Sequence, residues 1–208
     1  TLIAGDSDHL WGNFLVAEGL VDPDRHKALN EHYYQQYQQG QLDIDEYLSF
    51  ALGPMAGMTP ATLSLLQDKF LKAHVEPILL DAAFDLLQAH RIKGDILVII
   101  TATNTLVAQP IADRLGVEHL IGCEAQLKDG QYTGKSRGIP SFGEGKVQRI
   151  KAWCAENRTS LNGAVFYSDS NNDLPLLREV TQAIAVDPDD LLRREAQKCG
   201  WEIISLRT

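Results

Sequence analysis

Residues 165–177 read Val-Phe-Tyr-Ser-Asp-Ser-Asn-Asn-Asp-Leu-Pro-Leu-Leu, which places two carboxylates and two amides between a short apolar strand and a new helix. Asp169 follows the expected strand at 164–167, and doubly wound sheets bind their ligands beyond the carboxyl ends of parallel strands. Carboxylate oxygens at that edge suit Mg²⁺, which takes only one or two carboxylates from a protein and keeps several waters. The stretch therefore predicts a Mg²⁺ site, with Asp169 and Asp173 as candidate ligands.

Asp173 also has a simpler interpretation, as the cap of the helix that follows it. Aspartate is a favoured N-cap, and Pro175 suits the first turn of a helix that begins at Leu174. A cap would explain Asp173 but not Asp169, so the metal site is the favoured interpretation.

Strands and helices alternate on both sides of this stretch from about residue 78 onward. Strands are expected at 96–100, 118–122, 164–167, 183–186 and 203–206, with a hairpin turn at Asp129-Gly130. Helices are expected between them, at 81–90, 106–115, 145–156 and 174–179. This alternation predicts an α/β fold with a doubly wound, Rossmann-like, mostly parallel sheet.

The first third of the chain contains helix signals and no strand candidate. Helices are expected at about 8–18, 24–38, 43–52 and 60–73. Asp22-Pro23 and Thr59-Pro60 each place a cap before a first-turn proline, and Asp43 with Glu46 has capping-box spacing. These signals predict a helical cap formed by residues 6–74, inserted into an α/β core formed by residues 1–5 and 75–208.

The composition is that of a soluble globular protein, with 44% hydrophobic and 23% charged residues in a chain of 208. The net charge of −9 argues against sequence-independent nucleic-acid binding, because that mode needs clustered Lys and Arg. No apolar run approaches the roughly 20 residues of a membrane span, so neither a membrane nor nucleic acid is an expected partner. No signal peptide is expected either. Nothing indicates an oligomeric state.

The three cysteines, Cys123, Cys154 and Cys199, are widely spaced and form no metal-binding pattern. An odd number of such cysteines indicates reduced thiols and a cytoplasmic location.

Hydroxyl and amide side chains follow the expected strand at 96–100, in the run Thr101-Ala102-Thr103-Asn104-Thr105. Thr101 is expected to be the first side chain past the strand. Because a helix N-terminus binds anions through free N–H groups, this run could hold a phosphate. An N-cap supplied by Thr103, Asn104 or Thr105 is an equally good explanation.

Lys146 opens a helix after the flexible turn 141–145. A lysine early in a helix is mildly unfavourable to the helix dipole, which is a weak indication of another role. The alternative is an ordinary solvated surface charge.

Taken in chain order, Thr101, Lys146 and Asp169 with Asn172-Asp173 resemble the second, third and fourth motifs of the haloacid dehalogenase superfamily. The closest resemblance is to its phosphoserine-phosphatase-like branch (subfamily IB), whose members carry a helical cap inserted after the first motif. The resemblance covers essentially all 208 residues, and its most specific part is the segment from Asp169 to Leu177.

This resemblance implies hydrolysis of a small phosphate ester through an aspartyl-phosphate, with Mg²⁺ as cofactor. Asp169 would be a direct metal ligand. Asp173 would support the waters of the metal or hold Asn172 and Lys146 in place.

The same resemblance implies that Thr101 and Ala102 bind the phosphoryl oxygens, together with Asn172. Lys146 would offset the charge of the phosphate and of the nucleophile, the type of electrostatic stabilisation on which phosphoryl transfer depends.

The first motif of the family, Asp-x-Asp-x-Thr after an apolar strand, aligns in two ways. Asp6-Ser7-Asp8 has the Asp-x-Asp spacing, but only four residues precede it and Leu10 stands where threonine is expected. In the favoured alignment Thr1 is the threonine of the motif, so the nucleophile, the general-acid aspartate and the first strand would lie upstream of Thr1. The chain would then be inactive in this form. The neighbours of a missing central strand would have unpaired backbone groups, so the sheet would be interrupted or its gap filled by something else.

In the favoured alignment, Asp6 lies at the mouth of the cap, where related phosphoserine phosphatases carry an acidic residue that binds the ammonium group of the substrate. Asp6, Asp8 and Asn104 are therefore candidate substrate residues. An N-cap cluster for the first cap helix is the alternative for the two aspartates.

The cap contains a single arginine, Arg25, at the exposed start of a helix, whereas phosphoserine needs a cation for its carboxylate. An amino-alcohol phosphate such as histidinol phosphate needs only an acidic group. The aromatic residues that could pack on it, or else belong to the core of the cap, are His9, Trp11, Tyr33 and Tyr34.

Two other functions fit some of these residues. A receiver-type phospho-acceptor module also uses Asp, Mg²⁺, Thr and Lys, but its lysine follows all its acidic residues, whereas Lys146 precedes Asp169. A catalytically silent binding protein of the same fold is the other alternative.

Overall fold

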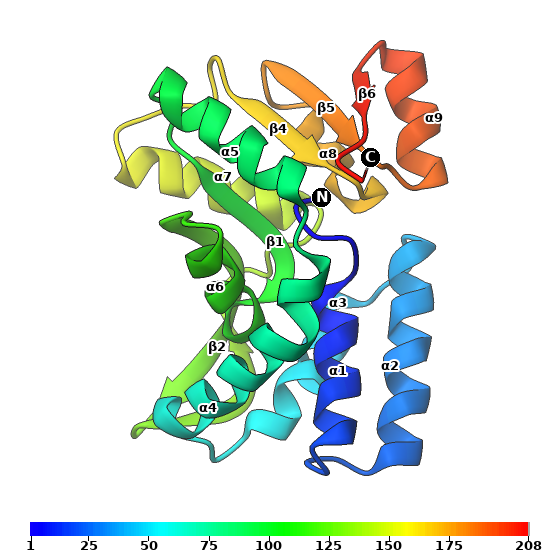
Figure 1. Cartoon of the computed structure of the whole chain (residues 1–208), viewed down its shortest axis with the longest axis vertical. Helices are drawn as coiled ribbons and strands as arrows, with labels where there is room; N and C mark the ends of the chain where they lie inside the picture. The colour runs from blue at the N-terminus through cyan, green and yellow to red at the C-terminus, as the bar shows by residue number, and fades with distance from the viewer. Residues whose placement is uncertain (208) are drawn as a thin grey trace.

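A computed structural model describes residues 1–207, and its helices and strands follow the expected order (Figure 1). The helices are α1 (Ser7–Ala17), α2 (Pro23–Gln38), α3 (Ile44–Leu52), α4 (Pro60–Phe70), α5 (Asp81–Lys93), α6 (Thr105–Arg114), α7 (Glu144–Glu156), α8 (Leu174–Leu177) and α9 (Asp190–Cys199). The strands are β1 (Val98–Asn104), β2 (His119–Lys128), β3 (Gln131–Arg137), β4 (Val165–Ser168), β5 (Gln182–Val186) and β6 (Glu202–Ile204). The mixed α/β class with a parallel sheet core is confirmed.

Helix starts in the first third follow the capping signals of the sequence. Asp22 accepts a hydrogen bond from the backbone N–H of Arg25 at 2.8 Å, and Thr59 accepts one from Thr62 at 3.2 Å. Asp43 accepts from two backbone N–H groups at the start of α3. Each aspartate or threonine thus satisfies donors that the first turn of a helix leaves free.

The strands form two three-stranded sheets, in the orders β1-β2-β3 and β4-β5-β6. The second sheet is parallel throughout, whereas β2 pairs in parallel with β1 and antiparallel with β3. Asp129 and Gly130 form the hairpin turn between β2 and β3 with positive φ angles, as predicted. Among residues 1–207 the pairing joins no residue of β1 to β4, so the parallel core is divided between these two strands.

The end of β1 corrects a sequence prediction, because the strand continues through Asn104 rather than ending at Ile100. Its regular pairing does stop at Ile100, opposite Ile121, and resumes with Asn104 opposite Cys123. Residues 101–103 therefore bulge out of the ladder. Gly122 makes room for the bulge, because a Cβ atom there would lie 2.8 Å from the carbonyl oxygen of Thr103.

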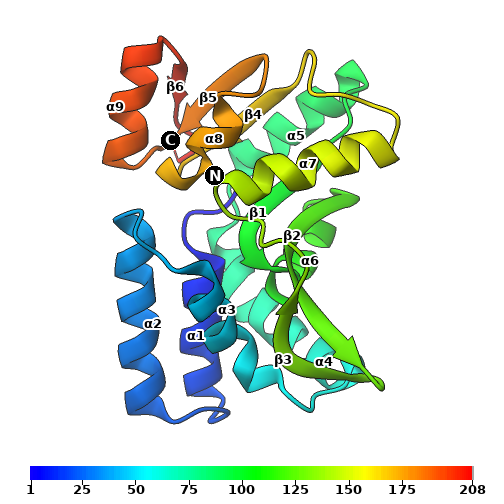
Figure 2. The ribbon, with the colours of Figure 1, turned by 180° about the vertical axis from the view of Figure 1, so that it is seen from behind.

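Helices cover both faces of the region around β1 and β4, with α5 in front in Figure 1 and α7 in front in the reverse view of Figure 2. Helices α1 to α4 lie together in the lower half of Figure 1, where the β2–β3 hairpin packs against α3. The largest core cluster joins these helices to α6 through Trp11, Phe14, Leu48, Leu63 and Val107. The expected domain boundaries near residues 6 and 74 stay a prediction.

Cys123 and Cys154 are buried free thiols, and Cys199 is an exposed one. In the part of the chain that the structure describes, no helix has the length and apolar character needed to cross a bilayer.

Candidate active site

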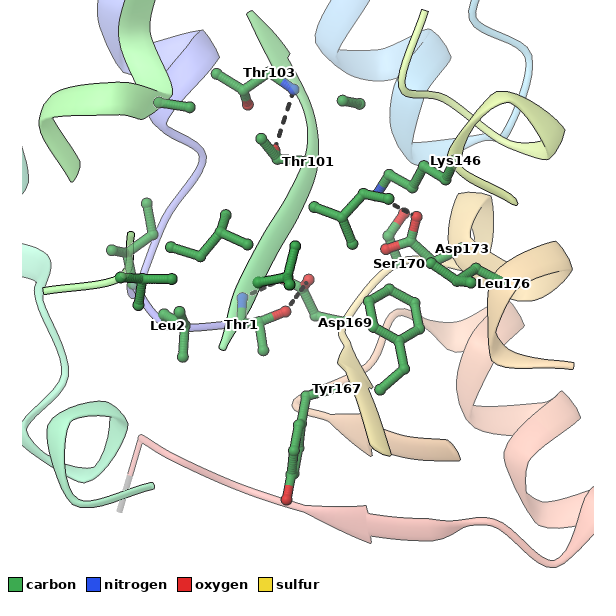
Figure 3. Close-up of a pocket in the computed structure, with 18 of the residues that line it drawn as sticks. Thr1, Leu2, Thr101, Thr103, Lys146, Tyr167, Asp169, Ser170, Asp173 and Leu176 are labelled. Atoms are coloured by element: carbon green, nitrogen blue, oxygen red, sulfur yellow. Dashed lines mark hydrogen bonds and ion pairs between the residues drawn. The ribbon is translucent and has the colours of Figure 1, made fainter. Parts of the chain in front are cut away.

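One cavity of about 1010 Å³ opens between β1, β4 and the helices of the first third, and most of the predicted site residues line it. Figure 3 shows Thr101 on one side of it, with Lys146, Asp169 and Asp173 on the other. The sites that the sequence placed after β1, at the start of α7 and after β4 therefore meet at one edge, as parallel strands require. Of the residues predicted to catalyse or to bind the metal, the phosphate or the amine of the substrate, Asn104 and Asn172 lie outside this lining.

Lys146 and Asp173 form a buried ion pair at this edge. Lys146 Nζ lies 2.5 Å from Asp173 Oδ1, and the two residues are 4% and 6% exposed. Ser168, the last residue of β4, donates a hydrogen bond to the other carboxylate oxygen of Asp173 at 2.7 Å. Both oxygens of Asp173 are thus engaged, and they fix the position of the Lys146 ammonium.

This pair excludes two simple interpretations from the sequence. Lys146 is not a solvated surface charge, because its side chain is buried against Asp173. Asp173 precedes α8 but makes no capping hydrogen bond to it. Ser170 caps the turn at 171–173 instead, by accepting a hydrogen bond from the backbone N–H of Asn172.

Asp169 follows β4 and lines the cavity. The Thr1 hydroxyl donates a hydrogen bond to Asp169 Oδ1 at 2.8 Å. A carboxylate at this edge is a suitable first ligand for a hard cation.

The donor set fits Mg²⁺ rather than a metal that needs many protein ligands. Among residues 1–207 no three His, Cys, Asp or Glu side chains converge as a metal cluster. Mg²⁺ needs only one or two carboxylates together with waters and phosphate oxygens. Asp169 supplies one such carboxylate in the cavity lining. Asp173 already pairs with Lys146, so the role of Asp173 as a direct metal ligand stays a prediction.

The bulge at residues 101–103 forms the opposite wall of the cavity, with Thr101 and Ala102 in the lining. The Thr101 hydroxyl accepts a hydrogen bond from the backbone N–H of Thr103 at 3.1 Å (Figure 3). This contact orients a side chain that the sequence predicted to face phosphate.

Asn104 is fully buried and makes two contacts. Its side-chain oxygen Oδ1 accepts a hydrogen bond from the backbone N–H of Val107 at 3.3 Å. Of the three N-cap candidates from the sequence, Asn104 is therefore the one that caps α6. Its amide donates to Asp8 Oδ1 at 3.1 Å. Asn104 therefore helps to position Asp8 without lining the cavity itself. A direct contact between Asn104 and substrate stays a prediction.

Asn172 connects the turn after β4 to the cap. Its amide donates to the hydroxyl of Ser170 at 3.1 Å and to the backbone oxygen of Tyr37 in α2 at 3.2 Å. Asn172 is not among the residues that line the cavity, so its contact with phosphate stays a prediction.

Asp6 and Asp8 lie at the junction of cap and core and line the cavity. Asp6 is the N-cap of α1, as the alternative interpretation predicted, and accepts from the backbone N–H groups of Asp8 and His9 at 2.9 Å. Burial raises the pKa of Asp6. Burial and the charge of Asp6 raise the pKa of Asp8 to about 7, against hydrogen bonds from Tyr47 and Asn104.

The structure divides the aromatic candidates into two groups. His9, Tyr33 and Tyr34 line the cavity, whereas Trp11 is 2% exposed within the cap core and does not. Arg25 is exposed on α2, as expected.

Several lining residues were missed at the sequence level. They are Tyr37, Tyr47, Ser170 and Arg207. Tyr47 bonds Asp8, and the pKa of Tyr37 is raised by burial and by the charge of Asp173. The only signal for the tyrosines was their place on cap helices, where a core role is the ordinary expectation.

Comparisons with known proteins identify the family of the chain. Residues 1–178 match the model of the haloacid dehalogenase-like hydrolase family. A histidinol-phosphatase of Neisseria meningitidis is 39% identical over 211 residues, which cover 100% of this chain and 95% of that protein.

Solved structures show the same architecture. A protein of unknown function from Bordetella pertussis superposes with a TM-score of 0.92 at 39% identity, covering 99% of this chain and 94% of that one. A substrate-bound phosphoserine phosphatase superposes with a TM-score of 0.69 at 14% identity, covering 100% of this chain and 89% of that one, which shows a shared fold. From the family match and these likenesses, the chain belongs to the haloacid dehalogenase-like hydrolases.

Proposed function

We propose that this protein is a Mg²⁺-dependent phosphatase that hydrolyses a small, amine-bearing phosphate monoester. The single observation that carries the proposal is the convergence of Thr101, the Lys146–Asp173 pair and Asp169 around one cavity. Family membership and the name of the Neisseria relative support the same reaction class.

In this proposal the residues of the chain hold the phosphoryl group and offset its charge. Thr101 and Ala102 bind phosphoryl oxygens from the bulge of β1. Lys146 faces the transferring group, and Asp173 with Ser168 keeps its ammonium in place before the substrate arrives. Such preorganised charge supplies most of the stabilisation in phosphoryl transfer.

Asp169 would hold the Mg²⁺ ion, which when bound would neutralise phosphate charge. The nucleophile would be an aspartate from a strand outside residues 1–208. Its carboxylate would attack phosphorus while the ester oxygen leaves as the alcohol, and water would then hydrolyse the aspartyl-phosphate. Residues 1–208 alone would not turn over substrate.

The charges of the cavity favour an amine over a carboxylate in the substrate. Asp6 and Asp8 face it together. The Lys and Arg residues in the described lining are Lys146 and Arg207, and each already pairs with an aspartate, at 2.5 Å and 3.8 Å. An amino-alcohol phosphate such as histidinol phosphate therefore fits better than phosphoserine, whose carboxylate would need an unpaired cation.

The test is hydrolysis of histidinol phosphate, phosphoserine and an aryl phosphate by residues 1–208 and by a chain extended at its amino end with an apolar strand and Asp-x-Asp-x. We expect Mg²⁺-dependent release of phosphate by the extended chain alone, fastest from histidinol phosphate. Failure of the extended chain on all three esters would contradict a phosphatase. Activity of residues 1–208 that is lost in Asp6→Asn would instead assign the nucleophile to Asp6.

A further inference from the structure

A second, much smaller chamber lies inside the helical region, among α1, α2 and α3. Helices α1 and α2 lie side by side there (Figures 1 and 2). About 10 Å³ of the chamber is open to the centre of a water molecule, and its lining includes Trp11 and His26. Asp8, Asn30 and Tyr47 line both this chamber and the large cavity, so their side chains form the wall between the two.

Two buried nitrogens of the chamber lining have no hydrogen-bond partner among the described residues. They are Trp11 Nε1 and His26 Nε2, on residues that are 2% and 7% exposed. Folded proteins leave few such groups unpaired, and an ordered water is the usual partner where the protein supplies none. Two unpaired nitrogens around one chamber therefore indicate a ligand that both of them can bind.

The chamber has the size and the polar groups that one water molecule requires. A buried water needs about 10–15 Å³ for its centre and about two to four hydrogen-bonding partners. The indole N–H of Trp11 can only donate, and the carboxylate of Asp8 accepts. Burial lowers the pKa of His26, which favours the neutral ring, and a neutral ring with its proton on Nδ1 offers Nε2 as an acceptor. One donor and two acceptors match what a single water can accept and donate.

A cation does not fit the same set of groups. The indole N–H of Trp11 would find no acceptor on an ammonium or a metal ion. The unpaired nitrogens therefore select water over a positively charged ligand.

We propose that this chamber binds one ordered water molecule, which accepts a hydrogen bond from Trp11 Nε1 and donates to His26 Nε2 and to the carboxylate of Asp8. The water completes the set of groups that hold Asp8. Asn104 donates to Asp8 Oδ1 at 3.1 Å, and Tyr47 bonds the carboxylate from α3.

Trp11 and His26 are then positioning residues for the large cavity. They act on it through the water and Asp8, without contacting a ligand in it themselves. This role rests on the proposed function, because only there does Asp8 meet the amine of a substrate. The water site itself does not depend on the proposed function.

The direct test is a crystal structure of residues 1–208 at a resolution that shows ordered waters. We expect one density peak within about 3.2 Å of Trp11 Nε1, His26 Nε2 and an oxygen of Asp8. A chamber without this peak would overturn the water site. So would a direct hydrogen bond from Trp11 Nε1 to Asp8.

Two variants each remove one partner of the water and keep an aromatic ring in place. They are Trp11→Phe and His26→Phe, and the second keeps the stacking on Phe50, whose ring centre lies 4.5 Å from that of His26. Each variant should weaken the hydrogen bond from the water to Asp8. The pH at which Asp8 titrates, followed by NMR of its carboxyl carbon, should therefore rise by about half to one pH unit.

Trp201→Phe and His32→Phe are the matched controls, because they remove the same ring nitrogens from residues that line neither the chamber nor the large cavity. Both should leave the titration of Asp8 unchanged. The other titrating groups that act on Asp8 are Asp6, Tyr47 and Cys123, and all four variants retain them. An Asp8 titration that moves as far in the controls as in Trp11→Phe and His26→Phe, or that moves in none of the four, would overturn the proposal.

Binding to residues 1–208 tests the positioning role, by calorimetry with histidinol phosphate and with inorganic phosphate. Trp11→Phe and His26→Phe should weaken the binding of histidinol phosphate by about three- to tenfold, because its amine meets Asp8. The binding of inorganic phosphate should stay unchanged. Equal losses for both ligands would show general damage to the fold, and no loss for either would show that ligand binding does not depend on the water, so each result overturns the positioning role.

The outcomes separate this inference from the proposed function. If the unaltered chain binds inorganic phosphate but not histidinol phosphate, the amine-bearing substrate and the positioning role fail together. The density peak and the titration of Asp8 would still decide the water site.

Discussion

Lys146 Nζ lies 2.5 Å from Asp173 Oδ1, with both residues almost fully buried and 27 positions apart in the chain. This buried ion pair is stabilised by its short contact and by the hydrogen bond that Ser168 donates to the other carboxylate oxygen of Asp173. Loss of one partner leaves a buried charge without compensation.

Replacing Lys146 with alanine should therefore lower the free energy of unfolding by about 3–5 kcal/mol, measured by urea denaturation. Lys151→Ala is the control, because Lys151 and Glu179 form an exposed pair, 55% and 42% accessible, that contributes about 1 kcal/mol or less. A loss at Lys146 no larger than the loss at Lys151 would show that the pair does not bear on stability.

Ser168→Ala removes the hydrogen bond to Asp173 Oδ2 and should cost about 1–3 kcal/mol, because it leaves a buried carboxylate oxygen without a donor. Ser49→Ala provides the comparison, since Ser49 donates to the backbone of Asp45 on an exposed face of α3. Urea denaturation of the two variants side by side measures the difference. Equal losses would contradict the role given to Ser168.

Stability should fall as the pH rises from about 4 to 7, because of Asp8. The folded protein raises the pKa of Asp8 from 3.8 to about 7, so between these values the folded state binds more protons than the unfolded state. The loss can reach about 4 kcal/mol, from about three pKa units at about 1.36 kcal/mol each. Unfolding free energies at pH 4 and pH 8 measure most of it.

Asp8→Asn should reduce this dependence on pH, whereas Asp24→Asn, at an exposed position of α2, should leave it unchanged. The raised pKa of Asp6 acts in the same direction, so Asp8→Asn should retain a part of the dependence but not all of it. If the Asp8→Asn protein kept the full pH dependence of stability, a titrating group other than Asp8 would be its cause.

Gly122→Ala should destabilise the protein by about 1–3 kcal/mol and weaken its binding of inorganic phosphate. The new Cβ would lie 2.8 Å from the carbonyl oxygen of Thr103, so the bulge that carries Thr101 must shift. Gly53→Ala is the control, because nothing lies within 4 Å of a Cβ at that position. Urea denaturation and calorimetric titration with phosphate measure the two effects, and unchanged phosphate binding would remove the bulge from the site.

Asp169→Asn should abolish Mg²⁺ binding measured by calorimetry, and should lower the turnover of an active, extended chain by more than about 100-fold. Asp190→Asn, at an exposed position of α9, should change neither quantity. Magnesium binding that survives Asp169→Asn would show that the ion has another ligand.

Local signals predicted the fold well where the information lies within a few residues. The starts of α2 and α4 follow from Asp22-Pro23 and Thr59-Pro60, and the hairpin turn follows from Asp129-Gly130. The predicted end of β1 was wrong, because the bulge in this strand depends on Gly122, which lies on the neighbouring strand β2. A polar run after an apolar one resembles the end of a strand whenever the partner strand is unknown.

The candidate site was predictable to the extent that parallel strands bring their carboxyl ends together. That rule placed Thr101 and Asp169 at one edge before any contact was known. The burial of Lys146 was not predictable, because it depends on Asp173, which the chain brings beside it only through tertiary packing. Tyr37 and Tyr47 were missed because aromatic residues on cap helices have the same sequence pattern whether they face a core or a cavity.

The hydrogen bond from Asn172 to the backbone oxygen of Tyr37 ties the turn after β4 to the last part of α2. Gly40, just beyond that helix, lies so close to the same turn that a Cβ would be 2.9 Å from Asn171 Oδ1. Helix α2 therefore cannot move outward without releasing the turn. The packing of α2 against the turn and the order of the turn are thus thermodynamically linked, so whatever orders one of them stabilises the other to the same degree.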